Sequence, residues 1–107
     1  MKDTVTLWAE AFNSGDPKRV VSLYTKDAVL LATLCPELLS KKAMSGYFYD
    51  LLVTKGAKVQ VGKYVKVMGV ESGFYVFRLD DGTKVVARFT FVPNGTHIST
   101  HHSSELP

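Results

Sequence analysis

The second half of the chain constrains the fold most, because from Ala57 onward it is strand-like almost without interruption. Helical patterns occur only earlier in the chain. Helices first and a succession of antiparallel strands afterwards is typical of the α+β class, so we expect N-terminal helices packed on a strongly curved, mostly antiparallel, cone-shaped sheet. The expected strands are rich in Val, Phe and Tyr, are separated by Gly-bearing turns, and cover residues 57–68, 73–80, 83–92 and 96–104.

The first half of the chain is expected to contribute three helices and one strand. Apolar residues at helical spacing predict a helix over residues 4–13. Asp16, which precedes a proline, is a typical helix N-cap and predicts a second, short helix. Ser40 can cap a third helix over about 41–53, and the apolar run at 27–33 predicts a buried strand.

Length and composition bound the kind of protein. A chain of 107 residues forms one domain, residues 1–107, with a single core. No apolar run approaches the roughly 20 residues of a membrane span. The first ten residues, MKDTVTLWAE, contain acidic residues where a secretory signal would be apolar, so we expect a cytoplasmic protein without a membrane partner.

The charge pattern argues against a nucleic-acid-binding protein, and the cysteine content argues against a disulfide-bonded or cysteine-rich metal protein. The net charge is +3 and the sequence pI is about 9.0, but the basic residues are scattered rather than gathered in the stripe that nucleic-acid binding requires. A mildly basic domain suits a small anionic ligand equally well. The one cysteine, Cys35, excludes an internal disulfide and a cysteine-rich metal site.

Two turns decide which side chains of the sheet share a face. Residues 80–83 (DDGT) and 93–96 (PNGT) are typical of a type I turn closed by a glycine bulge. Paired residue numbers then sum to about 162 in the first hairpin and about 188 in the second, so even-numbered residues share one face, whereas a two-residue loop would reverse the assignment. The even face holds Val76, Arg78, Val86, Arg88, Thr90, Ile98, Thr100, His102 and Ser104. The odd face holds Tyr75, Phe77, Leu79, Val85, Ala87, Phe89, Phe91, His97, Ser99, His101 and Ser103.

The closing strand carries adjacent histidines, His101 and His102, which project to opposite faces and cannot chelate one ion together. We therefore expect no metal and no other cofactor. On the even face, Arg78, Arg88 and Thr100 would crowd His102 and Ser104, which predicts an anion pocket beneath the helices. The alternative is a solvated sheet face. Because the odd face is also apolar, we expect a homodimer or higher homo-oligomer.

Several stretches of the chain follow a familiar order: FNSGDPKRVVSLYTKDAVLLAT, GYFYDLL, GFYVFRL, ARFTFV and ISTHHSSELP. Together they resemble the nuclear transport factor 2-like (cystatin-like α+β) superfamily. The ending HHSSELP, residues 101–107, carries a closer similarity. Through it the chain looks most like the branch that contains the association domain of calmodulin-dependent protein kinase and the iota-class carbonic anhydrases.

The resemblance implies two versions of one pocket. In iota-class carbonic anhydrases a metal-free pocket binds bicarbonate, and the matching positions here are Thr33, Tyr47 and Ser104 with His102. Kinase association domains line the corresponding pocket with arginines, which Arg78 and Arg88 resemble. The loop around Pro93 is short, and the Trp that is usual near Thr96 in that branch does not occur here.

Three hypotheses for function follow, and the sequence leaves them open. The first is metal-free carbonic anhydrase-like hydration of carbon dioxide, a lyase reaction, with Thr33, Tyr47 and Ser104 positioning the reactants and His102 accepting the proton. The second is a non-catalytic module that binds a small carboxylate and assembles into oligomers. The third is acid–base chemistry on a hydrophobic ring, as in ketosteroid isomerases and polyketide cyclases, for which Glu37 is the only nearby carboxylate.

Overall fold

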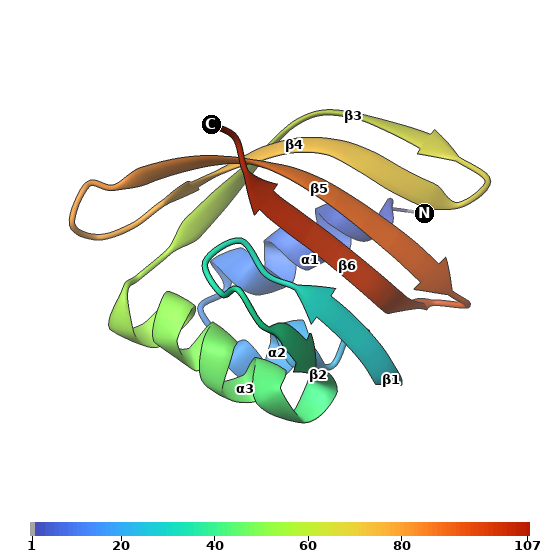
Figure 1. The fold of residues 1–107 in the computed structure, drawn as a ribbon, viewed down its shortest axis with the longest axis horizontal. Helices are drawn as coiled ribbons and strands as arrows, with labels where there is room; N and C mark the ends of the chain where they lie inside the picture. Colours follow the sequence, from blue (N-terminus) through green and yellow to red (C-terminus); the bar gives the residue numbers. More distant parts are fainter. Residues whose placement is uncertain (1) are drawn as a thin grey trace.

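The structure, a computed structural model, describes residues 2–107 as helices followed by a curved sheet (Figure 1). The helical elements are α1 (Thr4–Asn13), α2 (Pro17–Val21), α3 (Lys41–Tyr49) and the π-helical turn η1 (Asp50–Thr54). The strands are β1 (Tyr24–Leu31), β2 (Leu38–Ser40), β3 (Lys58–Val67), β4 (Val70–Arg78), β5 (Lys84–Asn94) and β6 (His97–Glu105). No helix within residues 2–107 is both long enough and apolar enough to cross a membrane.

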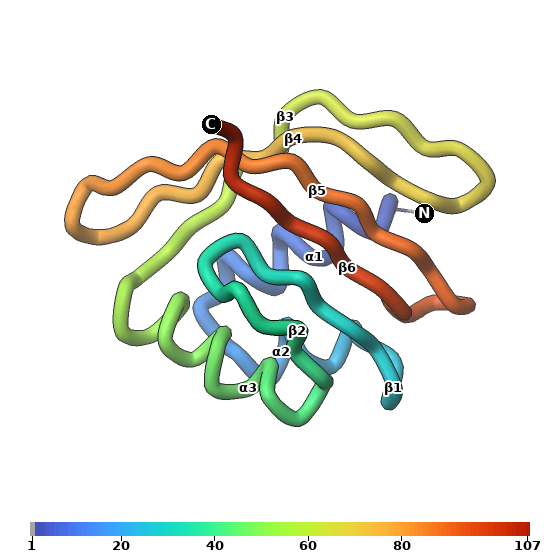
Figure 2. Tube along the Cα trace, in the orientation of Figure 1, coloured from blue at the N-terminus to red at the C-terminus, as the bar shows by residue number. Residues whose placement is uncertain are grey.

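One six-stranded sheet forms the body of the fold, in the order β2-β1-β6-β5-β4-β3. All neighbouring pairs are antiparallel except β1 and β6, which run parallel. The helices gather on the concave side of this sheet (Figure 2), and α1 packs against β3 and β5. The predicted α+β class with a curved, mostly antiparallel sheet is confirmed.

The helix boundaries follow local signals. The first helix has the predicted bounds, Thr4–Asn13, and the Asp16 carboxylate accepts a 3.0 Å hydrogen bond from the backbone N–H of Lys18 at the start of α2. The predicted third helix divides into α3 and the π-helical η1. The three-residue strand β2 was not predicted from the sequence. A strand this short has too few residues to display a period-two pattern.

A bulge in β3 bends the sheet into its cone shape. The pairing of β3 with β4 shifts between Val61 and Tyr64, opposite Gly73. A Cβ on Gly73 would lie 2.3 Å from the Lys63 carbonyl oxygen and 2.4 Å from Tyr64 Cβ. The close approach of the two backbones therefore requires glycine at this position.

The two hairpins test the predicted register. The first holds, since Arg78 pairs with Lys84 and residue numbers sum to 162 along β4 and β5. The second hairpin differs. Asn94 pairs with His97 across a two-residue loop, and such a loop alone would reverse the two faces. A bulge between Val92 and Pro93 restores the predicted parity from residue 100 onward. The prediction is wrong for Ile98, which is buried on the inner face.

The inner face of the sheet is the odd-numbered one. Tyr75, Phe89 and Phe91 are fully buried there, against Trp8 and other apolar residues of α1. The prediction that the even face encloses the pocket is wrong. Covering the aromatic face removes large apolar areas from water, whereas covering the even face would strip the hydration from two arginines.

One carboxylate is fully buried on the inner face. Glu71 of β4 accepts hydrogen bonds of 2.8 Å from the backbone N–H groups of both Thr4 and Val5. These are among the unpaired donors at the start of α1, and the positive end of the helix dipole also favours a carboxylate there. Glu71 therefore fixes the first turn of α1 against the sheet.

Candidate functional site

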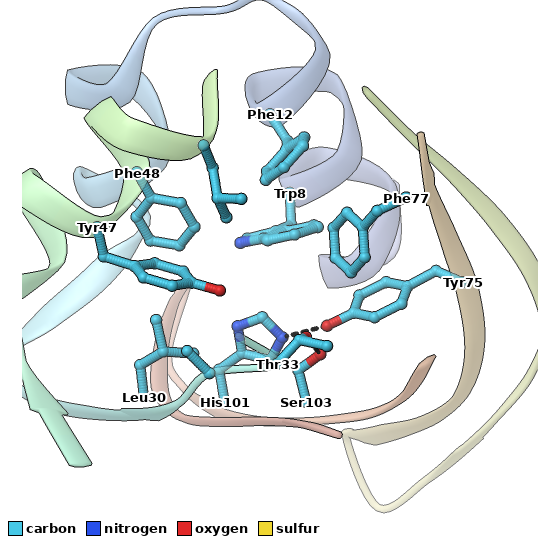
Figure 3. Close-up of a pocket in the computed structure, with 12 residues that line it drawn as sticks. Trp8, Phe12, Leu30, Thr33, Tyr47, Phe48, Tyr75, Phe77, His101 and Ser103 are labelled. Carbon is cyan, nitrogen blue, oxygen red and sulfur yellow. Dashed lines mark hydrogen bonds between the residues drawn. The ribbon is translucent and has the colours of Figure 1, made fainter. Parts of the chain in front are cut away.

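A small cavity lies between the helices and the inner face of the sheet (Figure 3). About 10 Å³ of it is open to the centre of a water-sized molecule, so it has room for a ligand of only a few atoms. Its walls are mostly aromatic and aliphatic, with a cluster of hydroxyls and one imidazole. The lining residues are Trp8, Phe12, Leu30, Ala32, Thr33, Tyr47, Phe48, Leu51, Tyr75, Phe77, His101 and Ser103.

A narrow apolar neck adjoins the cavity on the side of the loop that follows β1. Thr33 and Tyr47 belong to both spaces, and the neck adds Leu34 from the loop and Leu79 from the end of β4. Tyr47 is on α3, whereas Leu51 comes from η1. The π-helical turn thus continues the wall that α3 begins.

His101 is the centre of the polar cluster. Its Nδ1 lies 2.7 Å from the Tyr24 hydroxyl and its Nε2 lies 3.1 Å from the Tyr75 hydroxyl. The indole Nε1 of Trp8 donates a 3.0 Å hydrogen bond to the Tyr24 oxygen. The imidazole also stacks on Phe91, with 4.0 Å between ring centroids. Every face and nitrogen of the ring is therefore held.

Burial sets the protonation states in this cluster. Desolvation, with a smaller contribution from neighbouring His102, lowers the pKa of His101 from 6.5 to about 3, so its imidazole is neutral near pH 7. Desolvation raises the pKa of Tyr47 to about 12 and that of Tyr75 still further, although hydrogen bonds to Tyr75 from Ser103 and Thr33 oppose the rise. All these groups are uncharged at neutral pH.

Thr33 and Ser103 form a hydroxyl pair beside Tyr75. Their side-chain oxygens are hydrogen-bonded to each other, and Figure 3 shows them below the Tyr75 ring and facing Tyr47 across the cavity. Neither a carboxylate nor a cation is among the lining residues. Within residues 2–107 no group of three His, Cys, Asp or Glu side chains is arranged to hold a metal ion.

The structure separates the residues predicted for the site. Thr33 and Tyr47 line the cavity. Placing His102 and Ser104 in it was wrong, because both lie half-buried on the outer face of β6, as does Thr100.

The two arginines are also outside the cavity. Arg78 and Arg88 are exposed, and the Arg88 guanidinium carbon lies 5.7 Å from the Phe74 ring centroid on the outer face. Glu37 is exposed and does not line the cavity, which leaves ring-directed acid–base chemistry without its carboxylate.

Sequence reasoning missed His101, Ser103 and Tyr75 as site residues. Each shares the parity of the aromatic residues in β4 and β5. That pattern was visible in the sequence, and reading the most aromatic face as the enclosed one would have selected the correct histidine and serine of each adjacent pair.

Comparison with known proteins defines the family. No protein-family model and no curated protein sequence matches the chain. Among solved structures, a Xanthomonas campestris protein named for the association domain of calcium/calmodulin-dependent protein kinase II superimposes with a TM-score of 0.83. It is 33% identical, and the match covers 96% of this chain and 83% of that protein.

More distant structures share only the fold. SalBIII, an epoxide hydrolase/cyclase-like enzyme with a role in pyran ring formation in salinomycin, has a TM-score of 0.83 at 17% identity, covering 95% of this chain and 87% of that one. A Mycobacterium tuberculosis protein solved with estradiol-17β-hemisuccinate has a TM-score of 0.78 at 14% identity, covering 92% and 88%. The helices, the curved sheet and the 33% identity over nearly the whole chain together lead to one conclusion: the chain belongs to the family of the calcium/calmodulin-dependent protein kinase II association domain, and it has the nuclear transport factor 2-like, cystatin-like fold.

Proposed function

We propose that the protein catalyses metal-independent, carbonic anhydrase-like hydration of carbon dioxide in this cavity. One observation carries the proposal: the hydroxyls of Thr33, Tyr47 and Ser103 line a partly enclosed space with room for only a few atoms. Carbon dioxide is small, uncharged and equipped only with hydrogen-bond acceptors. A cavity with hydroxyl donors and no charged side chain suits it better than it suits a larger carboxylate.

In the proposed reaction carbon dioxide occupies the cavity and a water molecule attacks it from the neck. The water oxygen forms the new C–O bond while one C=O π bond of carbon dioxide breaks, and the π electron pair moves onto the carbon dioxide oxygen. One O–H bond of the water breaks, and the proton leaves to a solvent molecule at the neck. Negative charge develops on the former carbon dioxide oxygens, where the hydroxyls of Thr33, Tyr47 and Ser103 stabilise it by hydrogen bonding. The apolar walls strengthen these interactions because they exclude competing water.

The neck fits the same proposal. Leu34 and Leu79 present only apolar groups to an entering molecule. An uncharged reactant crosses such a passage without losing the strong hydration of an ion. The bicarbonate product would depart with its hydroxyl toward solvent.

Two adjacent serines on opposite faces of β6 provide a matched test. The rate of carbon dioxide hydration is measured by stopped flow with a chelator present. We expect Ser103→Ala to lower the hydration rate by about 100- to 1,000-fold, as loss of one stabilising donor does in other enzymes. Ser104→Ala, on the outer face, should retain the wild-type rate. A wild-type rate equal to that of buffer, a rate abolished by the chelator, or equal losses in the two variants would reject the proposal.

The outer face of the sheet supports a second proposed function, assembly with a second copy of the chain. Phe74, Val86 and Leu31 are 41%, 37% and 43% exposed there. A solvated face with several large apolar residues is typical of an interface. The family relationship to an association domain supports the same reading, and the oligomer would form through this face rather than through the odd one.

Sedimentation analysis tests this second function. We expect Val86→Lys, which places a charge on the outer face near the start of β5, to convert an oligomer to monomers while leaving the cavity intact. Val53→Lys, at a still more exposed apolar residue of η1, is the control and should keep the wild-type mass. A monomeric wild-type protein at high concentration would refute the assembly.

A further inference from the structure

The direction of the buried hydrogen-bond chain can be worked out from its inner end. Trp8 is fully buried, and an indole N–H can only donate. Its bond to the Tyr24 oxygen, 3.0 Å long, therefore has one polarity. Trp8 has no acceptor atom to receive the Tyr24 hydroxyl hydrogen in return.

The Tyr24 hydroxyl must then donate to His101. Within residues 2–107 its partners are Trp8 Nε1 and His101 Nδ1, and only the second can accept. If His101 Nδ1 carried a hydrogen instead, the fully buried Tyr24 hydroxyl would have no acceptor, at a free-energy cost typical of an unmade buried hydrogen bond. His101 Nδ1 is therefore an acceptor.

The remaining hydrogen of the neutral imidazole must be on Nε2. That N–H donates to the Tyr75 oxygen at 3.1 Å. The order of donation runs from Trp8 through Tyr24 and His101 to Tyr75.

The hydroxyl groups at the outer end give the cavity its polar character. The Thr33 and Ser103 hydroxyls are hydrogen-bonded to each other, so one of their two hydrogens lies between the pair. The Tyr75 and Tyr47 hydroxyls line the same space (Figure 3). Hydroxyl groups can donate a hydrogen bond to a ligand or accept one.

We propose that Trp8 and Tyr24 act as positioning residues that hold His101 as the Nε2–H tautomer, and that the cavity consequently offers a small ligand hydroxyl groups but no basic imidazole nitrogen. His101 has no free nitrogen and does not serve as a base toward the ligand. The ligand class rests on the proposed function only in that it concerns the same cavity. The tautomer of His101 does not depend on whether the protein hydrates carbon dioxide.

Nitrogen-15 NMR of the protein labelled at histidine tests the tautomer. We expect the wild-type spectrum to show His101 with a protonated Nε2 and an unprotonated, hydrogen-bonded Nδ1. Tyr75→Phe should keep this tautomer because Tyr24 still donates to Nδ1, whereas Tyr24→Phe should admit a mixture. A protonated Nδ1 in the wild type would overturn the proposal, as would an unchanged single tautomer in Tyr24→Phe together with a mixture in Tyr75→Phe.

Small probes test the ligand class through backbone amide shifts at Thr33 and Ser103. Azide and acetonitrile, an anionic and an uncharged acceptor, should give saturable shifts because the lining hydroxyls can donate to both. Thr33→Val should weaken azide binding about tenfold, the effect of one lost hydrogen bond, while Ser104→Ala should not change it. No saturable shift with either acceptor would contradict a hydroxyl-lined ligand site.

These measurements also separate the inference from the proposed function. If azide binds and Nε2 is protonated but carbon dioxide is not hydrated, then the hydroxyl-lined site and the tautomer stand and the catalytic proposal fails. If hydration occurs in a protein with a protonated Nδ1, the catalytic proposal stands and the direction of the hydrogen-bond chain is wrong.

Discussion

The two faces of β6 carry the same residue types in opposite surroundings. His101 and Ser103 are buried and line the cavity, whereas His102 and Ser104, their immediate neighbours, lie half-buried on the outer face. The side chains alternate because successive residues of a strand point to opposite sides. Residue type alone therefore does not identify the site residues of this strand. The face of the sheet on which a residue lies identifies them.

The neighbouring strands determine which face is enclosed. On the inner side, β6 adjoins β5 and β4, whose inward residues include Phe89, Phe91 and Tyr75. On the outer side, the same strands present Arg88 and Phe74 to solvent. The helices cover the side whose burial gains most apolar contact, and the polar residues of β6 that share this side become the site.

Replacing one buried and one exposed phenylalanine should give the largest difference in stability between the two faces. Phe89 is fully buried on the inner face, whereas Phe74 is 41% exposed on the outer face. We expect Phe89→Ala to lower the free energy of unfolding by about 3–5 kcal/mol and Phe74→Ala by about 1 kcal/mol or less. Urea denaturation of dilute protein measures both, and equal losses would contradict the assignment of the faces.

The pH dependence of stability should separate the two histidines next. The folded pKa of His101 is about 3 against an ordinary 6.5, so the unfolded chain binds more protons between these values. The stability from neutral His101 is therefore complete above pH 6.5 and is lost as the pH falls toward 3, with about 3 kcal/mol of it lost by pH 4.

Two glutamine variants measure that contribution. Urea denaturation from pH 7 to 4 should give His101→Gln a shallower decline than the wild type, because the titrating group has been removed. His102→Gln should retain the wild-type slope. If the slope follows His102 instead, then the buried imidazole is not the group that titrates.

Glu71 tests how the inner face accommodates a charge. Glu71→Gln removes a charge-assisted acceptor from the first turn of α1 and should cost about 1–3 kcal/mol of unfolding free energy. Glu10→Gln, which disrupts only an exposed pair with Lys2, should cost less than about 0.5 kcal/mol. Thermal denaturation of the two variants side by side checks this, and a Glu71 variant as stable as its control would show that the cap contributes little.

The smallest expected effect is on the outer face. The Arg88 guanidinium carbon lies 5.7 Å from the Phe74 ring centroid in an exposed cation–π contact. Arg88→Gln should cost about 0.5 kcal/mol in dilute protein, and Arg78→Gln should be near neutral. A loss above 2 kcal/mol for Arg88→Gln would mean that this face is far less solvated than its exposure indicates.

Much of the fold could be predicted because it depends on local chemistry. The bounds of α1 followed from apolar spacing, and the start of α2 followed from an Asp16 carboxylate that can reach the N–H of Lys18. The register of the first hairpin followed from its turn residues. The second hairpin kept the predicted parity only because its shorter loop is offset by a bulge, and Ile98 fell on the other face as a result.

The site could be predicted only in part, because it depends on which face the helices cover. Thr33 and Tyr47 were found through a family resemblance, and they do line the cavity. His102 and Ser104 were selected because they share a face with two arginines. That reasoning weighed the affinity of arginines for an anion above the larger gain from burying the aromatic rings of the opposite face.

Trp8 is the one tryptophan in the sequence, and it is part of the cavity wall, with its ring centroid 5.2 Å from that of His101. The indole emission of the molecule therefore originates entirely at the site. Excitation at the red edge of its absorption band would report changes in the polarity of the cavity when a small ligand binds, without any label in the unmodified protein.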